Sequence, residues 1–358
     1  MVLERVRGRR PDVQIAFTYF SPSAEGFASS VPADVRDYLP IDRARDVRRV
    51  LNALQPAALV FSKLDVWPVL AAEAKAGGVS LGLVSGTIAS GSSRLGPVGR
   101  ALLGDAYAAL DLAGAITPND AERLRLLGVP PGRLRITGDA RYDQVWSRAR
   151  RVLPDSPLLA PLASSRPTLV AGSTWPSDER VLLPAWLAVR GTVPTARLII
   201  ATHEPTERHL APIEQWGAEH GLILRRLTRI EHAASPDVVL VDRVGVLGEL
   251  YALATCAYVG GAFHAAGLHS VLEPAAYGVP VLFGPRYGGS PDAAPLVSAG
   301  GAAAAASPDE LSVHLTRWLS DPQERGRAGA HASRFVEAGL GAADRSCDLV
   351  LELLPPTA

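Results

Sequence analysis

The chain has 358 residues, 47% of them hydrophobic, and its 36 basic residues balance 36 acidic ones. This length predicts two domains, and the apolar share is enough for two buried cores without a bias toward disorder. The balanced charge excludes a nucleic-acid-binding protein that relies on bulk positive charge. No run of about 18 apolar residues and no visible signal peptide is found, so we expect a cytoplasmic protein without a membrane-spanning helix. Both cysteines, Cys256 and Cys347, stand in apolar stretches and are expected to be buried.

Short apolar segments alternate with helical stretches along the first half, as in a doubly wound α/β domain. The predicted strands cover residues 13–20, 57–62, 79–86, 113–117 and 134–139. Helices are predicted near residues 43–54, 66–76, 97–110 and 119–127. We therefore assign residues 1–151 to a Rossmann-like domain.

The second half repeats this alternation after residues 152–167, a Pro- and Ser-rich segment that is predicted to be a linker. Strands are predicted within residues 168–174, 196–204, 222–227, 238–242, 256–261 and 280–285. Residues 168–320 form the predicted second Rossmann-like domain, and residues 321–358 the predicted C-terminal helices.

The pattern between residues 242 and 285 indicates a nucleotide site. Gly260 and Gly261 follow an apolar strand and let the backbone approach a ligand closely. A helix is expected to begin just past this turn, where free N–H groups favour a phosphate. Glu273, one turn into that helix, can accept hydrogen bonds from ribose hydroxyls. Because no G-x-G-x-x-G sequence is present, the pattern favours a nucleotide-sugar over a dinucleotide.

The same segment resembles the C-terminal half of the 3-deoxy-D-manno-octulosonic acid (Kdo) transferases. The matching residues are Asp242, Gly245, Leu250-Tyr251, Val259-Gly260-Gly261, His269-Ser270-Val271-Leu272-Glu273-Pro274 and Pro280 to Pro285. Ser270 stands where that family usually has Asn, and its hydroxyl still forms hydrogen bonds. The resemblance implies an α/β, GT-B glycosyltransferase fold, in which two Rossmann-like domains face a cleft. In such folds the last helix often crosses back to the first domain.

Two further segments strengthen the resemblance. The G-S-T-x-x-x-(D)E pattern within 171–179 implies phosphate and sugar contacts from Ser173 and Thr174, although an ordinary capped helix start explains it too. His203 follows a strand where the family has a histidine-containing cluster beside the nucleotide, and the alternative is a surface histidine. The implied donor-nucleotide residues are Gly172, Ser173, Thr174, Thr202, His203, Val244, Gly245, Val246, Gly260, Gly261, His269, Ser270, Val271, Leu272 and Glu273.

Three loops of the first half resemble the acceptor side of the family. Residues 17–27 resemble its S-P-S-G loop, and residues 62–70 its K-x-E-x-W-P-N stretch, with Asp65 for Glu. The alternative for the second is a helix capped by Asp65 with Trp67 in the core. The hydroxyl-rich loop 85–96 has the character of a contact to an anionic substrate. The implied acceptor-side residues are Ser21, Ser23, Lys63, Ser92, Ser93 and Arg94.

No catalytic residue is assigned in this chain. The family has an anchor and an H-x-x-S-x-G-E motif whose glutamate is the general base, and Met1 to Glu4 align with the helix after that motif. The first strand of the domain would also lie upstream, which would expose an edge of the parallel sheet. A start site assigned too far downstream is our hypothesis, and a truly short protein is the alternative.

The resemblance implies the inverting transfer of Kdo from CMP-Kdo to a lipid A precursor, in lipopolysaccharide core biosynthesis. The acceptor implies peripheral contact with the cytoplasmic face of the bacterial inner membrane. Neither a cofactor nor a metal is implied. Two alternatives stay open: another GT-B enzyme that uses a UDP-sugar (a transferase or a UDP-N-acetylglucosamine epimerase), and a CMP-binding but catalytically dead homologue.

Overall fold

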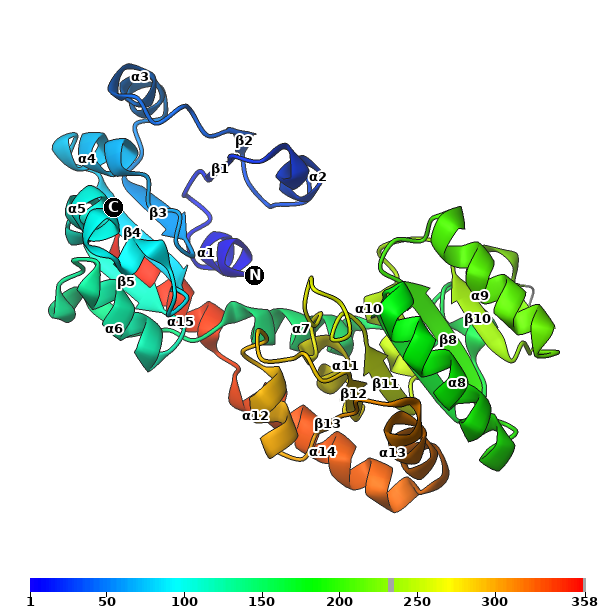
Figure 1. Ribbon diagram of the computed structural model, residues 1–358. Coiled ribbons are helices and arrows are strands. Elements are labelled where there is room, and N and C mark those ends of the chain that lie inside the picture. Colours follow the sequence, from blue (N-terminus) through cyan, green and yellow to red (C-terminus); the bar gives the residue numbers. More distant parts are fainter. Residues whose placement is uncertain (231–234, 357–358) are drawn as a thin grey trace. The chain divides into compact units, whose positions relative to one another are not determined.

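The computed structural model describes residues 1–230 and 235–356 and divides into two compact units (Figure 1). The first unit contains Met1–Asp143 and Gly339–Ala358, and the second contains Gln144–Ala338. Residues 231–234 of the predicted second domain and 357–358 of the predicted tail lie outside the described residues. Both units are α/β with parallel strand pairs, which confirms the predicted class. No helix within the described ranges is long and apolar enough to cross a membrane.

Within residues 1–143, all of which are described, the first unit has a four-stranded sheet in the order β3-β4-β5-β6 and a separate two-stranded sheet, β1-β2. The strands are β1 Ala16–Tyr19, β2 Val35–Tyr38, β3 Ala58–Ser62, β4 Ser80–Gly86, β5 Leu112–Ala115 and β6 Leu134–Ile136. The helices are α1 Val2–Arg9, α2 Glu25–Ala28, α3 Ala44–Leu54, α4 Pro68–Ala76, α5 Pro97–Ala108, α6 Pro118–Leu126 and α15 Ala342–Glu352, and α7 Ala140–Arg151 spans the unit boundary.

Glycines in the middle strands allow α15 to pack directly on the four-stranded sheet (Figure 1). A Cβ on Gly82 would collide with the Leu353 side chain, and one on Gly114 would lie 3.2 Å from Leu349 Cδ1. The first turn of α15 is fixed by Asp143, whose carboxylate oxygens accept from Gly341 N and Ala343 N at 2.9 Å each. The end of the chain thus completes the core of the first unit.

In the described part of Gln144–Ala338, the second unit has a seven-stranded sheet in the order β13-β12-β11-β7-β8-β10-β9. The strands are β7 Thr168–Thr174, β8 Arg197–Thr202, β9 Leu224–Arg226, β10 Val238–Val241, β11 Cys256–Val259, β12 Val281–Phe283 and β13 Ala302–Ala304. The α-helices are α8 Pro176–Thr192, α9 Glu207–Glu219, α10 Leu247–Leu250, α11 Leu272–Ala276, α12 Ala293–Ser298, α13 Pro308–Ser320 and α14 Pro322–Ala338.

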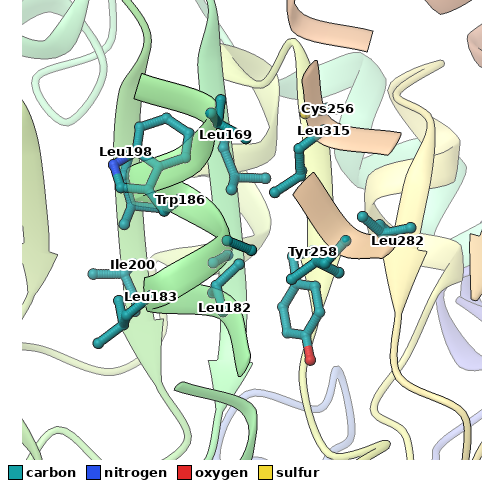
Figure 2. Packing of buried hydrophobic residues seen from close by; sticks show 14 of the residues in the cluster. Leu169, Leu182, Leu183, Trp186, Leu198, Ile200, Cys256, Tyr258, Leu282 and Leu315 are labelled. Carbon is teal, nitrogen blue, oxygen red and sulfur yellow. The ribbon is translucent and has the colours of Figure 1, made fainter. Parts of the chain in front are cut away.

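The core of the second unit lies between this sheet and helices α8 and α13 (Figure 2). Trp186 of α8 is fully buried against Leu169 and Leu198 of the central strands, and Leu315 of α13 packs in the same cluster. Burying each such side chain stabilises the fold by about 1.5–3 kcal/mol. Cys256 is buried here, as expected, and Cys347 is buried in the first unit.

Residues 152–167, the predicted linker, pack on the second unit. Leu159 and Leu162 are buried in a cluster with strand residues of β7, β8 and β10. The buried Arg197 donates to Leu162 O at 2.7 Å and to Thr168 Oγ1 at 3.3 Å, and burial lowers its pKa to about 10. Proline and serine predicted a linker, but the leucines among them determine where the segment packs.

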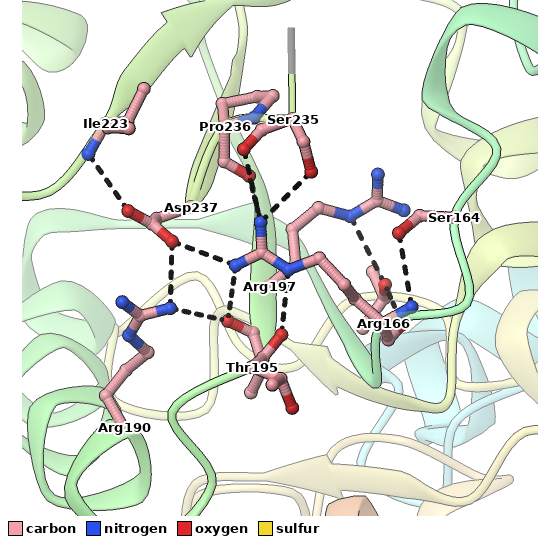
Figure 3. Close-up of polar contacts among 11 residues, drawn as sticks. Ser164, Arg166, Arg190, Thr195, Arg197, Ile223, Ser235, Pro236 and Asp237 are labelled. Atoms are coloured by element: carbon pink, nitrogen blue, oxygen red, sulfur yellow. Dashed lines mark hydrogen bonds and ion pairs between the residues drawn. The ribbon is translucent and has the colours of Figure 1, made fainter.

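Arg166, near the end of this segment, belongs to a network of hydrogen bonds around Asp237 (Figure 3). Asp237 Oδ1 accepts from Arg166 Nη2 at 2.8 Å and from Arg190 Nη1 at 2.9 Å, and Oδ2 accepts from Ile223 N at 3.2 Å. Burial opposes ionisation of this carboxylate, but these hydrogen bonds prevail and lower its pKa.

Asp237→Asn is therefore expected to lower the free energy of unfolding at pH 7 by about 1–3 kcal/mol, because two arginines lose their carboxylate. Because the pKa of Asp237 is lower in the folded than in the unfolded protein, its ionised carboxylate stabilises the fold at pH values above the unfolded pKa of about 3.9. This stabilisation is lost as the pH falls through the folded pKa. Urea unfolding at pH 7 and pH 3 would measure both effects. Asp155→Asn, at an exposed position, is the control. An equal deficit at both pH values would contradict the argument.

Candidate functional site

Most of the predicted donor-nucleotide residues lie around the carboxyl ends of β7, β8 and β11, which are neighbours in the sheet, whereas residues 244–246 follow β10. Backbone hydrogen bonds join the loops that follow these strands. Gly260 N donates to Gly172 O at 2.9 Å, His203 N to Thr174 O at 2.8 Å, and His269 N to Gly260 O at 3.1 Å. The structure therefore brings four separate segments of the predicted set together at the edge where open α/β sheets place their ligands.

Two positions in these loops require glycine. A Cβ on Gly260 would meet the Ser173 carbonyl oxygen and lie 2.7 Å from Thr174 Cα. Gly261 has φ +99°, and a Cβ there would collide with the Gly267 carbonyl oxygen. Ser173 itself has φ +54°, a left-handed conformation that costs a non-glycine residue about 1–2 kcal/mol. The end of β7 is thus a strained bulge in close contact with the β11 loop.

Four rings gather at this edge, and we call Trp175, His203, His264 and His269 the ring cluster. Trp175 stacks on His264 with ring centroids 4.1 Å apart and on His203 at 4.4 Å, and His203 stacks on His269 at 4.7 Å. Trp175 Nε1 donates to His269 Nε2 at 3.2 Å. Within residues 1–230 and 235–356, no group of three histidine, cysteine or acidic side chains is arranged to hold a metal ion.

Asp178, in the first turn of α8, holds these elements together. Its carboxylate is fully buried and accepts from Trp175 N, Gly261 N and the Tyr258 hydroxyl, each at 2.9 Å. The expected cap, Ser173 or Ser177, is wrong: Trp175 is the N-cap residue, and its N–H donates to the carboxylate of Asp178. The same carboxylate fixes the β11 loop. The sequence pattern marked Asp178 as an ordinary acidic residue of a helix start and did not reveal this second role.

The hydroxyls of Thr174 and Thr202 are already engaged. Thr174 Oγ1 donates to Glu179 Oε1 at 2.9 Å, and burial raises the pKa of Glu179, although this hydrogen bond opposes the shift. Thr202 Oγ1 donates to Glu204 O at 3.0 Å. Both threonines therefore shape the loops, whereas Ser173 is partly exposed at the end of β7.

The predicted helix start after Gly261 is wrong. The helix α11 begins only at Leu272, so His269, Ser270 and Val271 lie in the preceding loop and Glu273 lies in the first turn. The positive φ of Gly267, +88°, turns the chain before the helix. Pro274, without an N–H, is suited to the first turn of a helix and not to its interior.

Residues 244–246 precede α10 and lie next to a cation that the sequence did not single out. Arg148 Nη2 contacts Gly245 O at 3.5 Å, and a Cβ on Gly248 would lie 3.0 Å from Arg148 Cζ. Burial raises the pKa of the Glu273 carboxyl, and the positive charge of Arg148 opposes that shift. A half-buried carboxylate with a cation nearby is suited to accepting hydrogen bonds from hydroxyl groups.

The predicted acceptor-side residues lie on loops after β1, β3 and β4 of the first unit. Arg94 Nη1 donates to Leu64 O at 2.9 Å, which joins the loops that carry Lys63, Ser92 and Ser93. Ser21 and Ser23 bond to each other through their hydroxyls at 2.7 Å. The ring of Phe20, beside Ser21, lies 5.1 Å from that of Trp67.

Asp65 does not cap α4. That role belongs to Asp42, whose carboxylate accepts from Val69 N at 3.1 Å and Leu70 N at 2.8 Å. Trp67 is only partly buried, next to the core of the first unit. A cap supplied from 27 residues upstream leaves no local signal in the sequence.

Comparison with solved structures identifies the fold. UDP-GlcNAc 2-epimerase from Neisseria meningitidis bound to UDP-GlcNAc has a TM-score of 0.68 at 12% identity and covers 98% of this chain and 95% of that chain. A putative UDP-N-acetylglucosamine 2-epimerase from Listeria monocytogenes has a TM-score of 0.65 at 14% identity, over 98% and 91% of the two chains. The protein therefore has the GT-B fold, with two Rossmann-like domains.

Sequence comparison shows which family the chain is similar to. Residues 1–144 match the family model described as 3-deoxy-D-manno-octulosonic-acid transferase (kdotransferase). The 3-deoxy-D-manno-octulosonic acid transferase of Haemophilus influenzae is 26% identical over 95% of this chain and 80% of its own length. That of Bordetella pertussis is 29% identical, over 88% and 74%. The chain is therefore similar over most of its length to the Kdo transferases, which are glycosyltransferases, and the predicted resemblance is confirmed.

Proposed function

We propose that this protein transfers Kdo from CMP-Kdo to a lipid A precursor, and that the loops around the ring cluster bind the CMP part of the donor. The observation that carries the proposal is the joining of the Gly172–Thr174, Gly260–Gly261 and His269 segments at one sheet edge, in a chain that is similar to the Kdo transferases. The two glycines let these loops pack against one another, and the imidazoles beside them can donate hydrogen bonds to an anionic sugar nucleotide.

Each part of this edge has a proposed task. Ser173 and the imidazoles of His203 and His269 donate to the phosphate, whose charge increases as the bond to Kdo breaks. Glu273 accepts from the ribose hydroxyls. The Val244–Gly245–Val246 loop contacts the base, and Gly172, Thr174, Thr202, Ser270, Val271 and Leu272 hold the surrounding backbone in place. No residue described here is assigned as the general base.

The first unit is proposed to bind the acceptor through the loops with Ser21, Ser23, Lys63, Ser92, Ser93 and Arg94. A lipid acceptor would bring the protein to the cytoplasmic face of the inner membrane as a peripheral protein. The basic N-terminal helix does not present free charge for this contact, because its arginines are paired with aspartates. The pairs are Arg5 with Asp344, Arg7 with Asp34, and Arg9 with Asp344 and Asp348. The family and the acceptor's chemistry support the proposed location.

Calorimetric titration of the protein with CMP and with UMP tests the donor assignment. We expect CMP to bind at least about tenfold more tightly, the preference that one or two base-specific hydrogen bonds provide. Tighter binding of UMP would instead support an enzyme that uses a UDP-sugar. Release of CMP from CMP-Kdo in the presence of a lipid A precursor then tests the transfer, and CMP binding without release would support a catalytically dead homologue.

A further inference from the structure

The contact between Trp175 and His269 determines where the imidazole carries its proton. The indole Nε1–H only donates hydrogen bonds, so His269 Nε2, 3.2 Å away, must be the acceptor. A neutral imidazole that accepts at Nε2 carries its hydrogen on Nδ1. Among the described residues no hydrogen bond involves His269 Nδ1, and the side chain is only partly buried. The ring therefore has one free N–H, on the side away from Trp175.

We propose that Trp175 is a positioning residue: it fixes His269 as the neutral Nδ1–H tautomer, which presents a single hydrogen-bond donor to the phosphate of the bound nucleotide. This inference rests on the function proposed above and deepens it, because it specifies the chemical form of one ligand-binding group. Trp175 acts through His269, and nothing in the argument requires the indole to touch the substrate.

The surroundings of His269 favour the neutral form. Burial lowers its pKa, His203 stacked against it lowers the pKa further, and the carboxylate of Asp178 opposes them with a smaller effect. Protonation would also place a second N–H against the indole N–H and break the hydrogen bond. The remaining ring of the cluster, His264, stacks on Trp175 and not on His269. A neutral imidazole can donate to a phosphate without the cost of burying a cation.

The position of the Trp175 side chain is fixed firmly enough for it to determine the tautomer of His269. Its backbone N–H donates to the buried Asp178, and its ring stacks on both His203 and His264. The backbone of His269 is held in turn by its bond to Gly260 O. Both partners are thus fixed by contacts other than their own hydrogen bond, so little freedom is lost when that bond forms.

Nitrogen-15 NMR of the imidazole rings tests the inference without any ligand. At pH 7.5, His269 of the unaltered protein should show a protonated, pyrrole-type Nδ1 and an unprotonated, pyridine-type Nε2, with the signals assigned by their loss in His269→Gln. In Trp175→Phe, which keeps an aromatic ring but removes the N–H, the two nitrogens should give averaged signals and the pKa of His269 should rise. His264→Phe, which keeps a ring against Trp175, should leave the tautomer unchanged.

An Nε2–H or doubly protonated His269 in the unaltered protein would overturn the inference, as would an unchanged tautomer in Trp175→Phe. Titration with CMP provides a second test, of the contact between His269 and the phosphate. The Nδ1 signal should shift on binding, and Trp175→Phe should weaken CMP binding about threefold to tenfold, the worth of one hydrogen bond. A fixed tautomer whose Nδ1 signal does not respond to bound CMP would refute the phosphate contact. Failure of CMP to bind at all would contradict the proposed function instead.

Discussion

Gly260→Ala is expected to weaken CMP binding by more than about tenfold and to lower the free energy of unfolding by about 1–3 kcal/mol, the usual cost of overpacking. The new Cβ would meet the main chain of Ser173 and Thr174, including Thr174 Cα at 2.7 Å. Main-chain atoms within a sheet cannot turn away as a side chain can. The β11 loop must therefore separate from the end of β7, and the hydrogen bond from Gly260 N to Gly172 O is strained or lost.

Calorimetric titration with CMP, together with thermal unfolding, would measure the two effects. Gly326→Ala is the matched control, since Gly326 lies within α14 of the same unit and an added Cβ would have no neighbour within 4 Å. That change should stabilise the helix by roughly 0.5–1 kcal/mol and leave CMP binding unaltered. Unchanged CMP affinity in Gly260→Ala would show that the packing of these loops does not matter for the donor.

The regular elements could be predicted where a run of apolar residues determines them. The strand predicted at 168–174 matches β7, and the helix predicted at 43–54 matches α3 within a residue. Strands β2 and β13 were missed for opposite reasons. The sequence of β2 is polar and its residues are exposed, whereas β13 is an alanine run, and alanine does not favour strands. These two strands form because each pairs with a parallel neighbour. The local sequence alone does not predict that pairing.

The glycine turns and His203 could be found because each stands directly after an apolar strand, and the carboxyl ends of parallel strands meet at one edge. The residues that hold the site together could not. Asp178 reaches Gly261 across 83 positions of sequence, and Trp175 reaches His269 across 94. Such contacts depend on the strand order β11-β7-β8, which places β11 beside β7 although three strands intervene in the chain.

Asp178→Ala is expected to have the largest effect on stability, lowering the free energy of unfolding by about 3–5 kcal/mol, as breaking a buried charged network usually does. Three donors lose their acceptor at once: Trp175 N, Gly261 N and the Tyr258 hydroxyl. The last of these is buried, and water cannot replace the carboxylate there without opening the core. The start of α8 and the β11 loop are then no longer joined, so CMP binding should be lost even below the unfolding temperature.

Two further variants show whether the loss of stability comes from the buried carboxylate. Asp178→Asn keeps the size of the side chain, and its amide oxygen can take the place of Oδ2 and accept from Trp175 N and Gly261 N. Its NH₂ group then faces the Tyr258 hydroxyl, which has to accept instead of donate, and the negative charge is lost, so about 1–3 kcal/mol should be lost. Asp309→Ala removes an exposed aspartate from the first turn of α13, where only the helix dipole is affected, and should cost about 0.3–1 kcal/mol. Urea unfolding of the three variants measures the order of their free energies of unfolding directly. If Asp178→Ala were no worse than Asp309→Ala, the carboxylate would be an ordinary helix cap, and the joining of α8 to the nucleotide loops would have to come from the ring cluster alone.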